Sequence, residues 1–165
     1  GEADMVVPPA IAQDGEASEA FSQAVKSAKY AYNHLHHVLE DIHTYELMLG
    51  DSFMTEQEAR AKASKLANED ARFVLPEACQ TRMIVTMNAR ELNNFFKLRC
   101  CNRAQWEIRR VADEMLKLVY PIAPHLYKDA GPGCVAGKGC TEGSMTCGHM
   151  AQVQDKYNKI KEALV

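Results

Sequence analysis

The stretch 81–107 constrains this chain most, because a strand-like pattern there runs directly into the start of a helix. Residues 81–87 are rich in β-branched side chains and alternate with a period of two, which predicts a strand. Asn88 with Glu91 is typical of a helix N-terminus, so we expect a helix over 89–98. Around this turn the chain gathers polar side chains, with arginines at 82, 90, 99 and 103 and amides at 88, 93, 94 and 102.

Amphipathic patterns flank this stretch on both sides. Apolar side chains from Phe21 to Ile42 recur at three- and four-residue spacing, which predicts a long scaffold helix from about residue 14 to Gly50. Thr55 and Glu58 have the spacing of a capping box, so a second helix should run from there to about residue 70. We also expect an extended lead-in over 1–16, a helix over 102–120 that starts at Asn102 with Gln105, and a terminal helix over 151–164.

The fold class that these patterns predict is α+β but predominantly helical, with a strand-to-helix turn that binds a ligand. We place a domain boundary where the composition changes. Residues 1–130 form the main domain, and the glycine- and cysteine-rich residues 131–165 form a tail that ends in a short helix.

The overall composition excludes several classes of protein. Hydrophobic residues make up 47% of the sequence and charged residues 25%, as in ordinary globular domains. The sequence has no apolar run that could span a membrane and no secretory signal pattern. The net charge of -3 gives no general attraction to nucleic acid or to an anionic membrane. We therefore expect a cytoplasmic protein with mostly reduced thiols and with neither nucleic acid nor membrane as a partner.

The start of the predicted helix over 89–98 suits an anion, because unpaired backbone amides and the helix dipole both favour negative charge. Arg90 can add a forked, charge-assisted contact, and Asn94 lies four residues later on the same helix face. Arg99 lies at the exit of the helix, whereas Arg72 belongs to a separate element. The alternative is that these arginines are solvated or are paired with some of the 22 acidic residues of the chain.

Three segments carry a resemblance to a known family, namely ARFVLP from residue 71, TMNARELNNFFKLR from residue 86 and AQWEIRRVADEM from residue 104. Over roughly residues 69–120 the chain resembles the C-terminal half of the flavin-dependent thymidylate synthases, the ThyX family. The resemblance implies an enzyme that methylates dUMP to dTMP. Methylenetetrahydrofolate would donate the carbon, and FAD, reduced by NADPH, would supply the hydride.

The resemblance also implies roles for particular residues. The family residues that match Asn88, Ala89, Arg90 and Asn94 contact FAD, and those that match Arg72 and Arg99 bind dUMP. Arg99 would act in catalysis by stabilising a pyrimidine ionised at N3, because a guanidinium keeps its charge at working pH. The family further implies a homotetramer with active sites shared between subunits.

The chain departs from the family pattern in three places. It has Arg103 where many relatives have His, and residues 55–69 look like an insertion. The family signature RHRxxSxNExSxR, which normally precedes a segment like residues 5–10, does not occur in these residues. Because the sequence starts at Gly1 just where that signature would end, we expect a C-terminal half that does not catalyse by itself. The alternative function is a non-catalytic helical interaction or metal-binding module built on the same scaffold.

The cysteines suggest a second kind of chemistry. Cys134, Cys140, Cys147 and His149 could bind zinc, but their spacing lacks the CxxC knuckle, so we interpret them as a loop with reduced thiols and predict no metal site. Cys100 and Cys101 are interpreted as small buried or half-buried residues rather than nucleophiles. The histidines at 34, 36, 37 and 43 are interpreted as solvated or packed side chains on the scaffold helix.

Overall fold

The computed structural model describes residues 4–136 and 139–164. The chain divides into two compact units, Gly1–Met83 and Ile84–Val165. Both units are built from helices, so the predicted predominantly helical character is confirmed. No helix among the described residues combines the length and the apolar character needed to cross a bilayer.

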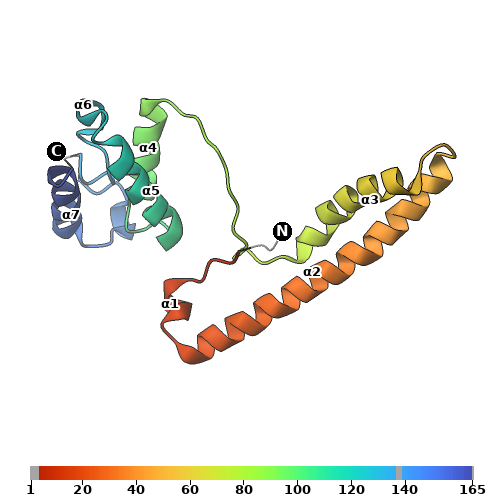
Figure 1. Cartoon of the computed structure of the whole chain (residues 1–165). Helices are drawn as coiled ribbons and strands as arrows, with labels where there is room; N and C mark the ends of the chain where they lie inside the picture. The colour runs from red at the N-terminus through yellow and green to blue at the C-terminus, as the bar shows by residue number, and fades with distance from the viewer. Residues whose placement is uncertain (1–3, 137–138, 165) are drawn as a thin grey trace. The chain divides into compact units, whose positions relative to one another are not determined.

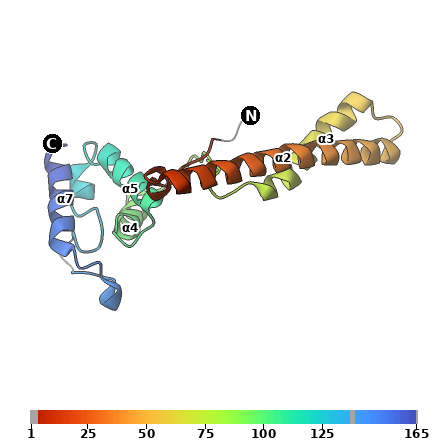
Figure 2. The same ribbon diagram turned by 90° about the horizontal axis from the view of Figure 1, so that it is seen from below.

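The first unit is a helical hairpin. The predicted scaffold helix is confirmed as α2 (Gly15–Gly50), which begins where the Asp14 side chain accepts a hydrogen bond from the backbone amide of Ala17 at 2.8 Å. After a short turn, α3 (Glu56–Ala71) runs back beside α2 (Figures 1 and 2). A short 3₁₀ turn, η1 (Arg72–Val74), follows α3.

A stripe of alanines lets α3 approach α2 closely. Ala59, Ala63, Ala67 and Ala71 recur every fourth residue, and all of them are 0% exposed. The Tyr32 hydroxyl on α2 donates a hydrogen bond to Oδ1 of Asn68 on α3 at 2.6 Å. Residues 55–69, which look like an insertion, therefore form a helix that covers one side of the scaffold helix.

The capping box at the start of α3 is confirmed. The Thr55 amide donates to the Glu58 carboxylate at 3.1 Å, and the Glu58 amide donates to the Thr55 hydroxyl at 3.3 Å. Two amides that the helix leaves unpaired are thus satisfied reciprocally. These bonds to Thr55 also lower the pKa of the Glu58 carboxyl.

The lead-in differs from the extended segment that the sequence predicts. Residues 4–6 are extended and pair with residues 78–80 through an isolated bridge between Met5 and Cys79. A one-turn helix, α1 (Pro9–Ala12), then follows, with Pro9 at its first position. Proline is favoured at this position because its fixed φ suits a helix and its missing N–H is not needed there.

The strand predicted over 81–87 is wrong for the described residues, which contain no strand. The segment is extended but exposed, with Met83 at 82% and Ile84 at 100% exposure. A strand needs a neighbouring chain segment to complete its hydrogen bonds, and none of the described residues lies beside this segment as a partner. The β-branched pattern was present, but a pattern alone cannot supply a partner.

The second unit packs short helices around one core. It contains α4 (Ala89–Arg99), α5 (Trp106–Val119), the one-turn α6 (Pro124–Tyr127), the 3₁₀ turn η2 (Gly143–Met145) and α7 (Met150–Glu162). Phe96 from α4, Leu116 from α5 and Tyr157 from α7 are all buried in this core. The predicted terminal helix is therefore confirmed, and it packs against the helices of the central stretch.

One predicted helix start is wrong. The sequence favours Asn102 as the cap of the next helix, but α5 begins at Trp106 with Gln105 as its N-cap. The Gln105 side chain accepts hydrogen bonds from the amides of Glu107 and Ile108 at 2.8 and 3.1 Å. Asn102 and Gln105 both have a side-chain amide that can cap a helix. Because the chain turns over residues 101–104, only Gln105 lies next to the first turn of α5.

Candidate functional site

The N-terminus of α4 forms as the sequence predicts. Oδ1 of Asn88 accepts a hydrogen bond from the Glu91 amide at 2.9 Å, and α4 then covers the predicted range and ends one residue later, at Arg99. Leu92 and Phe96 turn into the core. Because these apolar residues fix the rotation of the helix, the opposite face of α4 is presented to solvent.

That exposed face carries Arg90 and Asn94, and Arg99 lies at the C-terminal end of α4. Arg90, Asn94 and Arg99 are all exposed along α4, and Ala89 is half-buried at its first turn. Neither Arg90 nor Arg99 has an acidic group within 4.0 Å among the described residues, whose ion pairs involve other side chains. The pairing alternative is therefore not observed for these two arginines within that part of the chain, and their guanidinium groups are available to an anion.

Two further arginines of the prediction lie elsewhere. Arg72 is exposed at the C-terminal end of α3, in the first unit, so a role shared with Arg99 stays a prediction. Arg103 is exposed in the turn between α4 and α5. Its neighbour Asn102 is held by Arg109, whose Nη1 donates to the Asn102 carbonyl oxygen at 3.2 Å and lies 3.5 Å from Oδ1.

Asn93 has a structural role that sequence reasoning did not assign. Its Nδ2 donates to the carbonyl oxygens of Ala89 and Leu126, each at 3.1 Å, which ties the start of α4 to α6. Adjacent Asn94 faces solvent instead. The helical rotation of about 100° per residue separates the two amides, so Asn93 positions the helix that presents Asn94.

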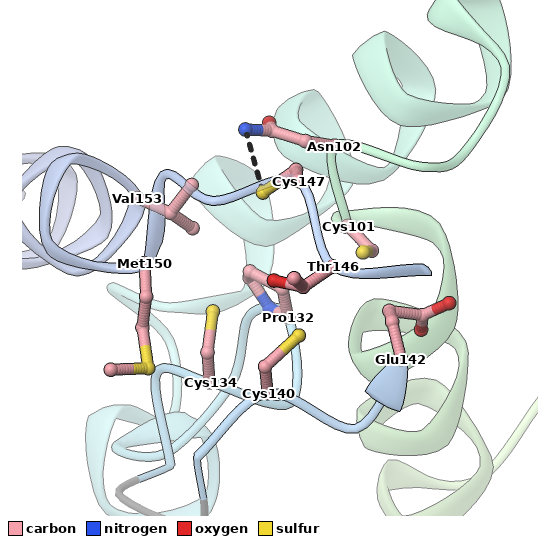
Figure 3. A pocket seen from close by; sticks show the side chains of 10 residues that line it. All are labelled: Cys101, Asn102, Pro132, Cys134, Cys140, Glu142, Thr146, Cys147, Met150 and Val153. Carbon is pink, nitrogen blue, oxygen red and sulfur yellow. Dashed lines mark hydrogen bonds between the residues drawn. The ribbon is translucent and has the colours of Figure 1, made fainter. Parts of the chain in front are cut away.

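A second group of side chains lies at the other end of α4. Cys101, Cys134, Cys140 and Cys147, here called the thiol cluster, line a cavity of ≈ 20 Å³ between the turn after α4 and the glycine-rich loop (Figure 3). All four are free cysteines. Nδ2 of Asn102 donates a hydrogen bond to Sγ of Cys147 at 3.8 Å. Burial raises the pKa of the Cys134 thiol, and the negative charge of the other three thiols, once ionised, raises it further.

The thiol cluster differs from the possible zinc ligands that the sequence suggests, namely Cys134, Cys140, Cys147 and His149. His149 is exposed at the start of α7 and does not line the cavity, whereas Cys101 does. Cys100 lies in the core, 1% exposed, and burial raises the pKa of its thiol to about 12. The adjacent cysteines thus separate into a core residue and a cavity residue. The apolar pattern of α4 could have indicated this, because it places Cys100 four residues after buried Phe96.

Comparison with known proteins identifies the family. The model of the family described as thymidylate synthase complementing protein matches residues 1–125. The chain belongs to this family. The resemblance found in the sequence is thereby confirmed.

Curated relatives agree with this assignment. A flavin-dependent thymidylate synthase from Clostridium tetani is 43% identical over 152 residues, which are 92% of this chain and 57% of that protein. The same-named protein of Geobacter sulfurreducens is 61% identical over 92 residues, 56% of this chain and 39% of that protein. That of Nitratidesulfovibrio vulgaris is 42% identical over 146 residues, 88% of this chain and 52% of that protein. This family member spans about half the length of the curated relatives that it matches.

Proposed function

We propose that this chain supplies the C-terminal part of the active site of a flavin-dependent thymidylate synthase, which methylates dUMP to dTMP. The observation that carries the proposal is the exposure of Arg90 and Asn94 on one face of α4, and of Arg99 at its C-terminal end, in a member of this family. The named activity of the relatives supports the reaction.

The N-terminus of α4 fits an anionic cofactor such as FAD. The Asn88 side chain satisfies the Glu91 amide, and the backbone amides of the first turn before Glu91 have no partner within the helix. Those amides and the Arg90 guanidinium would bind phosphate oxygens, and Asn94 on the same face would orient the cofactor. When bound, the flavin reduced by NADPH would supply the hydride, and methylenetetrahydrofolate would donate the carbon.

Arg72 and Arg99 are each proposed to bind dUMP, and Arg99 is proposed to assist the reaction. A guanidinium keeps its charge at working pH. Beside the N3 edge of the pyrimidine it would favour the ionised ring and so activate dUMP for methylation. This role needs no thiol nucleophile, which is consistent with the burial of Cys100.

We further propose that the enzyme is a homotetramer. Support comes from α2, whose C-terminal half exposes large apolar side chains, namely Val38 at 42%, Ile42 at 46%, Tyr45 at 67%, Met48 at 42% and Leu49 at 67%. Such a surface on one helix suits burial against another subunit. Light scattering coupled to gel filtration should give the mass of four chains, and a monomer would contradict this proposal.

The α+β class can also be proposed for the assembled enzyme. Residues 81–87 are exposed and rich in β-branched side chains, so they have the composition of a strand, and none of the residues that the structure describes pairs with them. Pairing with a strand from the rest of the enzyme would complete their hydrogen bonds. Amide hydrogen exchange at these residues should then be slow in the assembled enzyme and fast in the chain alone.

Flavin binding tests the proposed function. The chain is mixed with FAD, alone and together with the part of the Clostridium tetani relative that it does not match, and the flavin absorbance band is recorded before and after dUMP is added. A bound flavin whose band shifts with dUMP is expected. Arg90→Ala should weaken FAD binding, whereas Arg110→Ala, an exposed arginine on α5, should not. A mixture that stays free of bound flavin would leave the non-catalytic module as the better description.

A further inference from the structure

The thiol cluster brings together cysteines from separate parts of the sequence. The chain has 6 cysteines, and the four of the cluster come from the turn after α4, from the segment after α6 and from the loop that precedes α7. Figure 3 shows their thiol groups directed into one cavity from different sides. Four free cysteines around one cavity offer the soft sulfur ligands that a transition metal such as zinc prefers.

We propose that Cys101, Cys134, Cys140 and Cys147 form a zinc site of four thiolates. Zinc prefers four ligands in a tetrahedral arrangement, and structural zinc sites are closed by protein ligands alone. A set of four sulfur ligands is specific for zinc or an iron–sulfur cluster. The cavity of ≈ 20 Å³ holds about one water-sized particle, which suits a single ion and is too small for a cluster of several iron and sulfur atoms.

Metal binding would draw the thiols together. No three of their sulfur atoms lie within 4.8 Å of one another in the described part of the chain, whereas sulfur atoms about 2.3 Å from one zinc lie closer than that. Gly139 (φ +73°) and Gly148 (φ +74°) directly adjoin Cys140 and Cys147. Both glycines hold a left-handed backbone conformation that other residues rarely adopt, so the chain direction beside these two cysteines depends on glycine.

One member of the thiol cluster, Cys147, has an outer hydrogen bond, although Glu142 also lines the cavity. Four thiolates around one Zn²⁺ leave a net charge of about −2. Arg109 donates to the backbone carbonyl oxygen and to the side-chain Oδ1 of Asn102. These contacts fix the side-chain amide of Asn102, whose Nδ2 donates to Sγ of Cys147. Such an outer hydrogen bond orients a metal ligand and stabilises its charge.

A competing group of ligands is less suitable. His36, His37 and Glu40 have ligand atoms within 4.8 Å of one another. All three lie on one surface of α2, with His37 exposed, so they cannot enclose an ion. His36 already lies 3.4 Å from the Ser64 hydroxyl. The thiol cluster, by contrast, surrounds its cavity from several segments.

The argument for zinc does not use the proposed function, and three of the four ligands lie outside the match to the family model. Cys134, Cys140 and Cys147 lie beyond residue 125, where the match to the family model ends. The site would fasten the loop before α7 to the turn after α4. Its expected effect is to stabilise the second unit and to hold the turn that follows Arg99.

Metal analysis of the full chain tests the proposal. The chain is purified reduced, freed of metal, titrated with Zn²⁺ and analysed by elemental analysis, and Co²⁺ is used as a spectroscopic substitute. One tightly bound zinc per chain is expected, together with the intense visible bands of Co²⁺ in a tetrahedral thiolate site. Substoichiometric zinc, a disulfide among the four cysteines under reducing conditions, or an iron–sulfur absorption spectrum would overturn the proposal.

Single substitutions test the ligand set. Cys101→Ser, Cys134→Ser and Cys147→Ser should each weaken zinc binding by more than about 100-fold, and Asn102→Ala by about tenfold. Cys79→Ser, in the first unit, and His149→Ala should bind zinc like the parent chain. Circular dichroism checks that each variant is folded. If a variant does not fold, the Co²⁺ spectrum of the unmodified chain decides whether the tetrahedral thiolate site exists. Loss of zinc in His149→Ala with retention in Cys101→Ser would overturn the assigned ligands.

Discussion

The Tyr157 hydroxyl on α7 donates a hydrogen bond to the backbone carbonyl oxygen of Cys100 at 3.0 Å, where α4 ends. The same hydroxyl contacts the Asp113 carboxylate on α5, so one side chain joins three helices. Tyr157 is 1% exposed, and Lys156 neutralises Asp113 from the surface side. This contact links the glycine-rich tail to the helix that carries the proposed binding residues.

Removal of that hydroxyl should destabilise the second unit. Tyr157→Phe removes the one hydroxyl donor that the Cys100 carbonyl and the Asp113 carboxylate share, which should lower the free energy of unfolding by about 1–3 kcal/mol. Urea unfolding followed by circular dichroism measures the change. Tyr120→Phe is the matched control, because Tyr120 interacts through its ring, with the Lys161 ammonium 6.0 Å from the ring centroid. Equal losses in the two variants would contradict the role of the Tyr157 hydroxyl.

Alkaline pH should destabilise the same unit through Cys100. Burial raises the pKa of this thiol from its ordinary value of 9.0 to about 12. The unfolded thiol therefore ionises while the folded one stays neutral, so stability is full below about pH 9 and is lost as the pH rises toward 12. The slope from this group is at most about 1.4 kcal/mol per pH unit.

The alkaline effect is measured by urea unfolding between about pH 8 and 11 with a chelator present. Burial also raises the pKa of Tyr157, which acts in the same direction. Cys100→Ala should therefore reduce the slope without removing it, whereas Cys79→Ala should leave it unchanged. An unaltered slope in Cys100→Ala would show that the Cys100 thiol does not contribute.

The sequence predicted those features that depend on neighbouring residues. Thr55 with Glu58 and Asn88 with Glu91 form the expected caps, because capping involves only residues within one turn. The alternation over 81–87 failed to give a strand in the described residues, because a strand depends on a partner distant in the sequence. Gln105 rather than Asn102 caps α5. This choice depends on the conformation of the turn between α4 and α5, which the positions of Asn and Gln in the sequence do not predict.

In the candidate site, too, features set by neighbouring residues could be predicted, and features set by distant residues could not. The exposed face of α4 could be predicted, because Leu92 and Phe96 fix which side of the helix is buried. The participation of Cys101 in the thiol cluster could not, since it depends on how the loop before α7 folds against the turn after α4. Sequence spacing alone pointed to His149, which lies near Cys147 in the chain but outside the cavity.

Packing between α2 and α3 gives a prediction for the first unit. Ala67 is 0% exposed in the alanine stripe, so Ala67→Leu must force the two helices apart. The free energy of unfolding of this unit should fall by about 1–3 kcal/mol. Ala61→Leu on the exposed side of α3 is the control, because leucine and alanine have similar helix propensities. Thermal unfolding compares the two, and equal melting temperatures would show that the stripe is not tightly packed.

Arg99 gives the sharpest test of the proposed nucleotide contact. Arg99→Ala should weaken dUMP binding by about 2 kcal/mol or more, the loss expected for a charge-assisted hydrogen bond. Arg99→Lys should fall between the parent and the alanine variant, because an ammonium keeps the charge but not the planar fork. Calorimetric titration with dUMP measures both, in the chain mixed with FAD and the unmatched part of a relative. Arg110→Ala controls for the loss of one positive charge in the same unit. If Arg99→Ala binds dUMP as the parent does while only its melting temperature changes, Arg99 is a structural residue and does not bind the substrate.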